Sequence, residues 1–165
     1  MPSTEKSARP WITPEVQALL ATITDPQVTI ATVYGEARSE PIEGMIAVAN
    51  VIRNRVHDPR WGQTYRSVCL APWQFSCWNA VGGGRNLDRV VALVRQFAQK
   101  QTITDPVVRE LTYLVHGIVH DGWLRDTTKG ATHYHVATMQ PRPQWAQAQT
   151  PTCQRASHVF YAGVK

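Results

Sequence analysis

A group of carboxylates lies in the segment YGEARSEPIE, residues 34–43. Glu36 stands at the expected C-terminal end of a helix, and Glu40 and Glu43 follow it. Cleavage of a glycosidic bond needs an acid that protonates the leaving oxygen. A Glu in a partly apolar cleft has its neutral form favoured and can donate a proton near neutral pH. Taken alone, however, one Glu at a helix end is more often a solvated surface acid.

The two later carboxylates are less clear. On one continuous helix, Glu36, Glu40 and Glu43 would share a face, but Pro41 makes a continuous helix unsafe. We expect Ser39 or Glu40 to cap the helix that follows Pro41. Glu43 either contacts the substrate or forms a salt bridge with a basic residue of that helix, Arg53 or Arg55.

Helical signals position these residues. Thr13-Pro14-Glu15 and Asp25-Pro26 each combine a capping residue with Pro at the first helical positions. Apolar residues then recur at helical spacing. Five helices are expected. The first starts at Thr13, and the others cover Asp25 to about Ala37, Ile42 to Val56, Asn86 to Lys100, and Asp105 to Gly122.

Two segments lack this periodicity. Residues 58–85 are rich in aromatic side chains and form either a small sheet over the core or the wall of a groove. Residues 123–165 resemble loops with short strands. We therefore predict a predominantly helical α+β fold. The 165 residues suit a single domain covering residues 11–165, preceded by a disordered lead at residues 1–10.

The aperiodic segments also supply candidate substrate contacts. Gln74 offers an amide to sugar hydroxyl and N-acetyl groups, and Phe75 offers a ring to a pyranose face. Trp78 is as consistent with the core as with a sugar subsite. Together with Tyr34, the rings of Phe75 and Trp78 are candidates for the apolar surroundings of Glu36.

A polar and aromatic strand is expected at residues 132–135. Alternate residues of a strand point the same way, so one face of Thr132, His133, Tyr134 and His135 can line a cleft. We take Thr132, His133 and Tyr134 as candidate substrate contacts. The pattern does not decide between His133 and His135 for the position that faces the cleft.

The motifs together resemble those of a known family. YGEARSEPIEGMIAVANVIRNRV (34–56), PWQFSCW (72–78), GATHYH (130–135), the Pro-x-Trp-Ala at 143–146 and HVFY (158–161) are similar, in order, to motifs of the SleB/CwlJ-type cell-wall hydrolases. The resemblance spans roughly residues 27–161. It implies peptidoglycan cleavage, a fold similar to lysozymes and lytic transglycosylases, and a catalytic role for Glu36.

The resemblance and the carboxylates together predict the reaction. Hydrolysis by the usual routes needs a second carboxylate as nucleophile or base. The intervening Pro41 and the capping role expected of Glu40 argue against Glu40 and Glu43 in that part. One Glu suffices if the C6 hydroxyl of the sugar attacks. We therefore predict a lytic transglycosylase that cleaves between N-acetylmuramic acid and N-acetylglucosamine, with a muramidase that uses water as the alternative.

A metal enzyme is a less favoured alternative. His116 and His120 have the i, i+4 spacing that can hold zinc, and His133 or His135 could complete the site of an amidase or peptidase. However, Gly117 stands where a zincin-type motif would place Glu. We predict no metal and no cofactor. The three cysteines, Cys69, Cys77 and Cys153, cannot form a fully paired set, and pairing of the first two stays open.

Net charge and hydropathy limit the classes of partner that the protein can have. The net charge of +5 favours an anionic polymer such as a cell wall. The basic residues form no run of five, so we expect no nucleic-acid partner. No apolar run approaches the ~18 residues of a membrane span, and no secretory signal is visible. We expect a monomer made in the cytoplasm and acting on the wall after release, as a phage endolysin does through a holin-type pore.

Overall fold

A computed structural model describes residues 12–79, 84–119 and 122–165. The predicted disordered lead, His120 and the first glycines of the 82–84 run lie outside these ranges. The elements in chain order are α1 (Pro14–Leu20), α2 (Asp25–Ala37), α3 (Ile42–Val56), α4 (Tyr65–Cys69), the 3-10 helix η2 (Ser76–Trp78), α5 (Gly84–Ala98), α6 (Pro106–Val119), β1 (His133–Val136), α7 (Gln144–Gln147), β2 (Cys153–Arg155) and β3 (His158–Tyr161).

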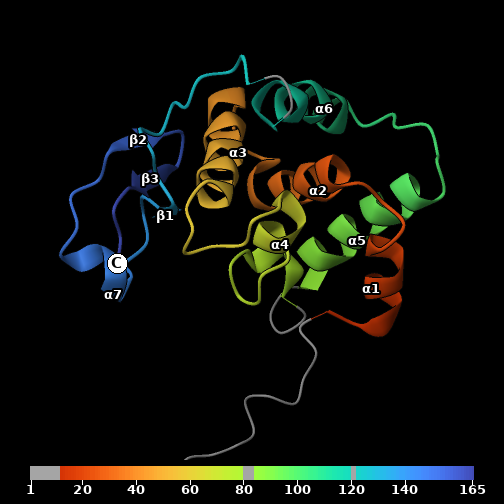
Figure 1. The fold of residues 1–165 in the computed structure, drawn as a ribbon, viewed down its shortest axis with the longest axis horizontal. Coiled ribbons are helices and arrows are strands. Elements are labelled where there is room, and N and C mark those ends of the chain that lie inside the picture. The colour runs from red at the N-terminus through yellow and green to blue at the C-terminus, as the bar shows by residue number, and fades with distance from the viewer. Residues whose placement is uncertain (1–11, 80–83, 120–121) are drawn as a thin grey trace, which may run out of the picture.

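Helix α2 is the centre of the helical part. Thr24 caps its start, and the side chain of Gln27 accepts from the Thr24 N–H in a capping box. Apolar residues occupy most of its circumference, which is typical of a helix surrounded by protein. Figure 1 shows α3, α4, α5 and α6 arranged around it. The last turn of α2, which carries Glu36, is therefore fixed by several neighbours.

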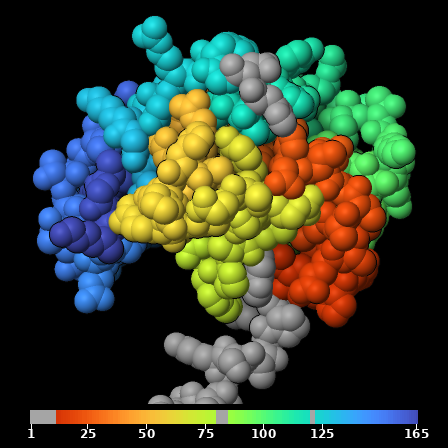
Figure 2. Space-filling model, viewed as in Figure 1, coloured from red at the N-terminus to blue at the C-terminus, as the bar shows by residue number. Residues whose placement is uncertain are grey.

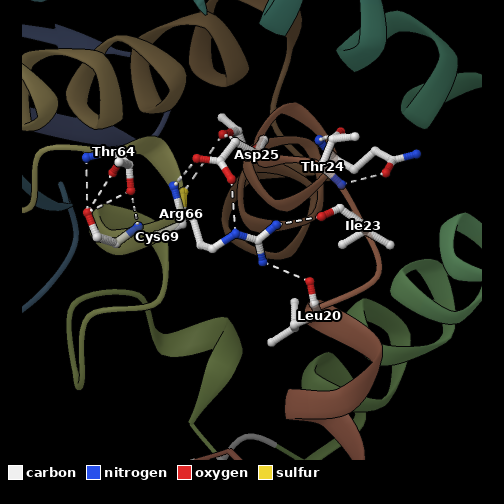
Figure 3. Close-up of polar contacts among 10 residues, drawn as sticks. Leu20, Ile23, Thr24, Asp25, Thr64, Arg66 and Cys69 are labelled. Carbon is white, nitrogen blue, oxygen red and sulfur yellow. Dashed lines mark hydrogen bonds and ion pairs between the residues drawn. The ribbon is translucent and has the colours of Figure 1, made fainter.

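Arg66 of α4 joins three helices (Figure 3). Its Nε donates to Asp25 Oδ1 at 2.9 Å, at the start of α2. Its Nη1 donates to the carbonyl oxygen of Leu20 at 2.7 Å, and Nη2 donates to that of Ile23. These bonds use the donors of one guanidinium to satisfy carbonyls at the α1–α2 junction, so α4 is tied to the base of the central helix.

A three-stranded antiparallel sheet packs beside α3. The strand order is β1-β3-β2, with Tyr134 opposite Phe160 and Cys153 also opposite Phe160. Buried Ala47 and Val51 of α3 form one apolar cluster with Ala131 and Phe160. Figure 1 places the sheet on the far side of α3 from α1 and α5. The predominantly helical α+β fold class is confirmed.

One local prediction is wrong, and one pair of alternatives is decided. Helix α3 has Pro41 at its N-cap, without a side-chain cap, whereas Ser39 or Glu40 was expected. The Glu40 carboxylate instead accepts from the Ser157 N–H and hydroxyl, next to β3. For Glu40, the hydrogen bonds to Ser157 replace the expected capping bond. The described part of the aromatic segment after α3 forms the short helices α4 and η2 and no strand. Of the two alternatives for this segment, it is therefore the wall of a groove and not a small sheet, since Trp73, Gln74 and Ser76 line a cleft.

The three cysteines are free thiols, and Cys69 and Cys77 are buried in the helical core. Burial raises the pKa of Cys69 to about 12. Among the described residues, no helix is both long enough and apolar enough to cross a membrane.

Candidate active site

The carboxylate of Glu36 is held by three donors from two distant segments. Oε1 accepts from the Cys77 N–H at 2.9 Å and from the Ser76 hydroxyl at 3.2 Å. Oε2 accepts from the Tyr134 hydroxyl at 3.0 Å. Each oxygen therefore has a fixed direction before any substrate arrives, as expected of a group that must transfer a proton at a defined position.

Gly35 lets the η2 segment approach α2 closely. A Cβ on Gly35 would lie 2.4 Å from Cys77 Cβ, closer than real atoms allow. Because Gly has no side chain, the Cys77 N–H can reach the neighbouring residue, Glu36. The Gly35 carbonyl accepts from Asn86 of α5 at 3.0 Å, so the end of α2 is also fixed from a third side.

Tyr134 supplies the donor from the sheet. Burial, together with the nearby Glu36 carboxylate, raises the pKa of the Tyr134 hydroxyl well above its ordinary value, so the hydroxyl stays protonated and donates. Its ring packs at 5.6 Å from Phe160 and edge-on at 5.1 Å from His158. These contacts with β3 hold the Tyr134 ring in place, with its hydroxyl on Glu36 of α2.

Glu36 lies in a cleft of about 430 Å³, lined by residues of the helical part and of the C-terminal part with the sheet. Figure 2 shows the yellow segment that follows α3 beside the blue C-terminal residues, with the outline hollowed between the blue and yellow-green parts. Among the described residues that line the cleft, Glu36 is the one carboxylate. The lining comprises Gly35, Glu36, Arg55, Trp73, Gln74, Ser76, Asn86, Tyr134, His135, Val136, Met139, Pro143, Trp145 and His158.

The rim of the cleft carries exposed apolar groups. Trp73 is 62% exposed, Met139 is 44% exposed, and both line the cleft. Flat aromatic faces beside polar groups suit the faces and hydroxyls of sugar rings. Gln74 is exposed in the same wall, where its amide is available to a ligand.

Three of the predicted apolar contacts do not face the cleft. Phe75 is 1% exposed and Trp78 is fully buried, with its indole N–H bonded to Thr32 Oγ1 at 3.1 Å, so neither ring is available to a sugar. Tyr34 points elsewhere, and its hydroxyl donates to Asp105 Oδ2 at 3.2 Å. Phe75 and Trp78 belong to the apolar core, and Tyr34 is partly buried against it.

Other predicted contacts also lie away from the cleft lining. Glu43 is exposed at the first turn of α3, and no ion pair joins it to Arg53 or Arg55 in the described structure. Thr132 is buried, and its hydroxyl is 3.0 Å from Nδ1 of His133.

The two histidines of β1 have different surroundings, and His135 is the one that lines the cleft. His133 packs against the rings of Trp61 and Trp145. Burial, with help from Arg55 and Arg60, lowers its pKa to about 4, so its ring is neutral at neutral pH. His135 lines the cleft, with Nδ1 2.8 Å from the Val136 carbonyl and Nε2 2.9 Å from the Tyr161 hydroxyl.

Several cleft residues were not assigned a role from sequence, among them Trp73, Ser76, Trp145 and His158. All four lie inside motifs that were recognised, namely PWQFSCW, Pro-x-Trp-Ala and HVFY. The motifs therefore contained these cleft residues. Which residues of a motif face a ligand depends on packing that the motif does not reveal.

One of the histidines considered for zinc, His120, lies outside the described residues. Among the described residues, no three His, Cys, Asp or Glu side chains cluster as metal ligands. His116 lines a different cavity of about 790 Å³ between α2, α5 and α6, together with Ile30 and Phe97. That cavity is larger than the Glu36 cleft, but no carboxylate among the described residues lines it.

Fold and site define a helical α+β domain with one carboxylate in an open, polar and aromatic cleft. Residues 39–161 match the family model for Cell Wall Hydrolase, which covers most of the chain. The chain belongs to this cell wall hydrolase family. Glu36 lies just before the matched residues.

Curated relatives and solved structures are consistent with this. Spore cortex-lytic enzymes of Bacillus subtilis strain 168 and Oceanobacillus iheyensis are 40% and 44% identical over 52 residues, or 32% of this chain. The matched region spans 17% and 19% of those relatives, less than a fifth of their length.

The structural similarity covers more of the chain. The catalytic domain of the Bacillus cereus SleB protein matches with a TM-score of 0.57 at 22% identity, covering 94% of this chain and 98% of that one. The catalytic domain of the germination-specific lytic transglycosylase SleB from Bacillus anthracis matches with a TM-score of 0.57 at 26% identity, covering 83% and 93%.

Proposed function

We propose that this protein cleaves the glycan strand of peptidoglycan between N-acetylmuramic acid and N-acetylglucosamine, as a lytic transglycosylase with Glu36 as its catalytic residue. The observation that carries the proposal is the position of Glu36, which is the sole carboxylate among the described residues that line the cleft. Membership of the cell wall hydrolase family and similarity to a protein called a lytic transglycosylase support the substrate and the reaction class.

A single carboxylate can perform both halves of this reaction. Glu36 first donates a proton to the glycosidic oxygen while the bond from that oxygen to C1 of muramic acid breaks. The C6 hydroxyl of the same sugar then bonds to C1 and returns its proton to Glu36. The product is a 1,6-anhydro ring, and Glu36 ends in its starting state.

The hydrolytic alternative needs a second carboxylate. For a retaining route it would lie about 5 Å from the acid, and for an inverting route about 6.5–9.5 Å. Glu40 was a sequence candidate, but Ser157 holds its carboxylate and it does not line the cleft. This favours attack by the substrate's own hydroxyl.

The first prediction tests the catalytic residue. Glu36→Gln keeps the shape of the side chain but removes the acid, and we expect a loss of about 10²–10⁴-fold or more in peptidoglycan lysis. Turbidity of purified sacculi measures the rate, and circular dichroism verifies the fold. Glu110→Gln on the exposed face of α6 is the matched control. A folded Glu36→Gln protein that lyses sacculi at the parental rate would exclude the assignment.

The second prediction concerns the product. Mass spectrometry of digested sacculi should show muropeptides that end in 1,6-anhydromuramic acid, with no new reducing ends. Muropeptides heavier than the anhydro form by the mass of one water would instead identify a muramidase or a glucosaminidase, while leaving glycan cleavage intact.

The biological setting is a further part of the proposal. We propose that the wall is reached after release through a holin-type pore, as for a phage endolysin, with peptidoglycan as the partner and the monomer as the active form. A gene for such a pore next to this one would support the proposal. Spore-germination genes in that position would contradict it.

A further inference from the structure

Arg55 lies in the wall of the cleft, held by contacts that leave one nitrogen of its guanidinium without a hydrogen-bond partner. The side chain is 4% exposed at the last turn of α3. The guanidinium carbon lies 4.1 Å from the ring centre of Trp61 and 5.0 Å from that of Phe75. Nε donates to the Thr132 carbonyl at 2.7 Å. These contacts fix the plane and direction of the whole group.

Nη1 of this guanidinium has no hydrogen-bond partner among the described residues, although it is buried. A guanidinium carries donors and no acceptor, and buried donors in folded proteins are nearly always bonded. Arg55 also lines the Glu36 cleft. The unsatisfied donor therefore belongs to a side chain in the wall of a space that a ligand can enter. Nη1 itself has less than 1 Å² of accessible surface, so a substrate oxygen bonds to it only when the groups that cover it move aside as the substrate enters.

The charges nearby select the kind of acceptor. Burial lowers the pKa of Arg55 to about 10, which leaves the group protonated at neutral pH. Glu36 and Arg55 line the same cleft and attract one another electrostatically. A carboxylate ligand would gain the attraction of Arg55 but meet the repulsion of Glu36. A neutral carbonyl oxygen, which is a strong acceptor without charge, avoids that repulsion.

We propose that Nη1 of Arg55 binds the carbonyl oxygen of the 2-acetamido group on the sugar whose glycosidic bond is cleaved. The inference rests on the proposed function and adds a substrate-recognition residue to it. The acetamido group is attached at C2, next to C1, and Glu36 must reach the oxygen on C1. Holding this group beside Glu36 therefore orients the scissile bond and favours N-acetylated glycan over de-N-acetylated glycan.

The experiment compares one polymer in three chemical states: native peptidoglycan, the same material after chemical de-N-acetylation, and the same material after re-N-acetylation. The parental protein should cleave the native form at least about tenfold faster, which corresponds to one hydrogen bond to a charged group, and re-N-acetylation should restore the rate. Arg55→Lys keeps the charge but cannot bond both Thr132 and the ligand. It should lose most of the preference for the N-acetylated form.

Arg53→Lys is the matched control, because Arg53 donates to the Leu124 carbonyl and lies outside the cleft lining. Its preference should equal that of the parental protein. A purely structural role for Arg55 would lower both rates equally and leave the preference unchanged, which would overturn the inference. A parental protein without any preference would also overturn it. A parental protein that cleaves neither form would instead contradict the proposed function.

A second measurement applies if Arg55→Lys does not fold. Full-length Glu36→Gln protein, which keeps Arg55, is titrated with tri-N-acetylchitotriose and with chitotriose while the guanidinium nitrogen resonances of Arg55 are followed by NMR. These oligosaccharides have no peptide stem, so stem carbonyls cannot contribute. We expect a shift with the acetylated trimer alone. Equal shifts with both trimers, or no shift with the acetylated trimer, would overturn the inference.

Discussion

At the scale of single residues, the two oxygens of Glu36 have different surroundings. Oε1 receives two donors from the η2 segment, whereas Oε2 receives the Tyr134 hydroxyl. The Tyr134 hydroxyl keeps its proton because burial and Glu36 raise its pKa. We infer that Tyr134 positions the carboxylate from the side opposite to Ser76 and Cys77.

Tyr134→Phe tests this positioning. The ring and its packing on Phe160 and His158 stay, but Glu36 loses a donor. Hydrogen bonds to charged groups contribute about 1.5–3 kcal/mol, so we expect kcat to fall by about 10- to 100-fold with little change in KM, and the melting temperature to fall by roughly 3–12 °C. Tyr113→Phe, at a residue that is 74% exposed, is the control. An unchanged kcat for Tyr134→Phe would refute the positioning role.

At the scale of elements, the site depends on how closely η2 lies on α2. Gly35 stands at the point of contact, one residue before Glu36, and a Cβ there would also meet Cys77 Sγ at 2.8 Å and a methyl group of Val90 at 2.8 Å. These atoms are parts of buried side chains of η2 and α5. The contact therefore cannot relax without moving the segment that donates to Glu36.

Gly35→Ala should accordingly affect stability and activity together. Forcing a methyl group into packed core costs about 1–3 kcal/mol of unfolding free energy, and displacement of η2 should lengthen the bond from Cys77 N–H to Glu36. Chemical denaturation and lysis assays measure the two effects.

Gly117→Ala on α6 is a comparison at a second helical glycine. Its Cβ would meet the Trp123 ring, which is 62% exposed and can move. Activity should be retained there. Parental stability and activity in Gly35→Ala would show that the close approach is not required.

At the scale of the whole molecule, the net charge of +5 bears on how the protein finds its substrate. Peptidoglycan sacculi are anionic polymers, and long-range attraction raises the rate of encounter with them. Salt screens this attraction over roughly 8 Å at physiological ionic strength. The charge is spread over the chain and forms no run of basic residues, so a general attraction is expected.

Lysis of sacculi should therefore slow as salt rises from about 0.05 to 0.5 M, a range over which the screening length shortens severalfold. Cleavage of a short neutral glycan by the same preparation is the control and should change little. A rate on sacculi that is independent of salt would mean that the charge serves another purpose.

The sequence by itself determined helices α1, α2, α3, α5 and α6 and the residue on which the proposed chemistry depends. Thr13-Pro14 and Asp105-Pro106 mark helix starts because a capping side chain and a fixed proline φ act locally. Asp25-Pro26 also marks a helix start, but the cap of α2 is Thr24, one residue earlier. These helices were predicted correctly within a few residues. Glu36 was selected because its motif recurs in a known family, and the family is confirmed by the match over residues 39–161.

The tertiary structure alone decided which side chains face the cleft. Phe75 and Trp78 are in a recognised motif, yet both are buried, while Trp73 beside them is exposed at the rim. Tyr134 meets Glu36 across 98 positions of sequence, because β1 packs on β3 and the sheet packs on α3. Sequence patterns report local preferences, whereas burial and long-range hydrogen bonds depend on which elements pack together, and that is settled only when the whole chain folds.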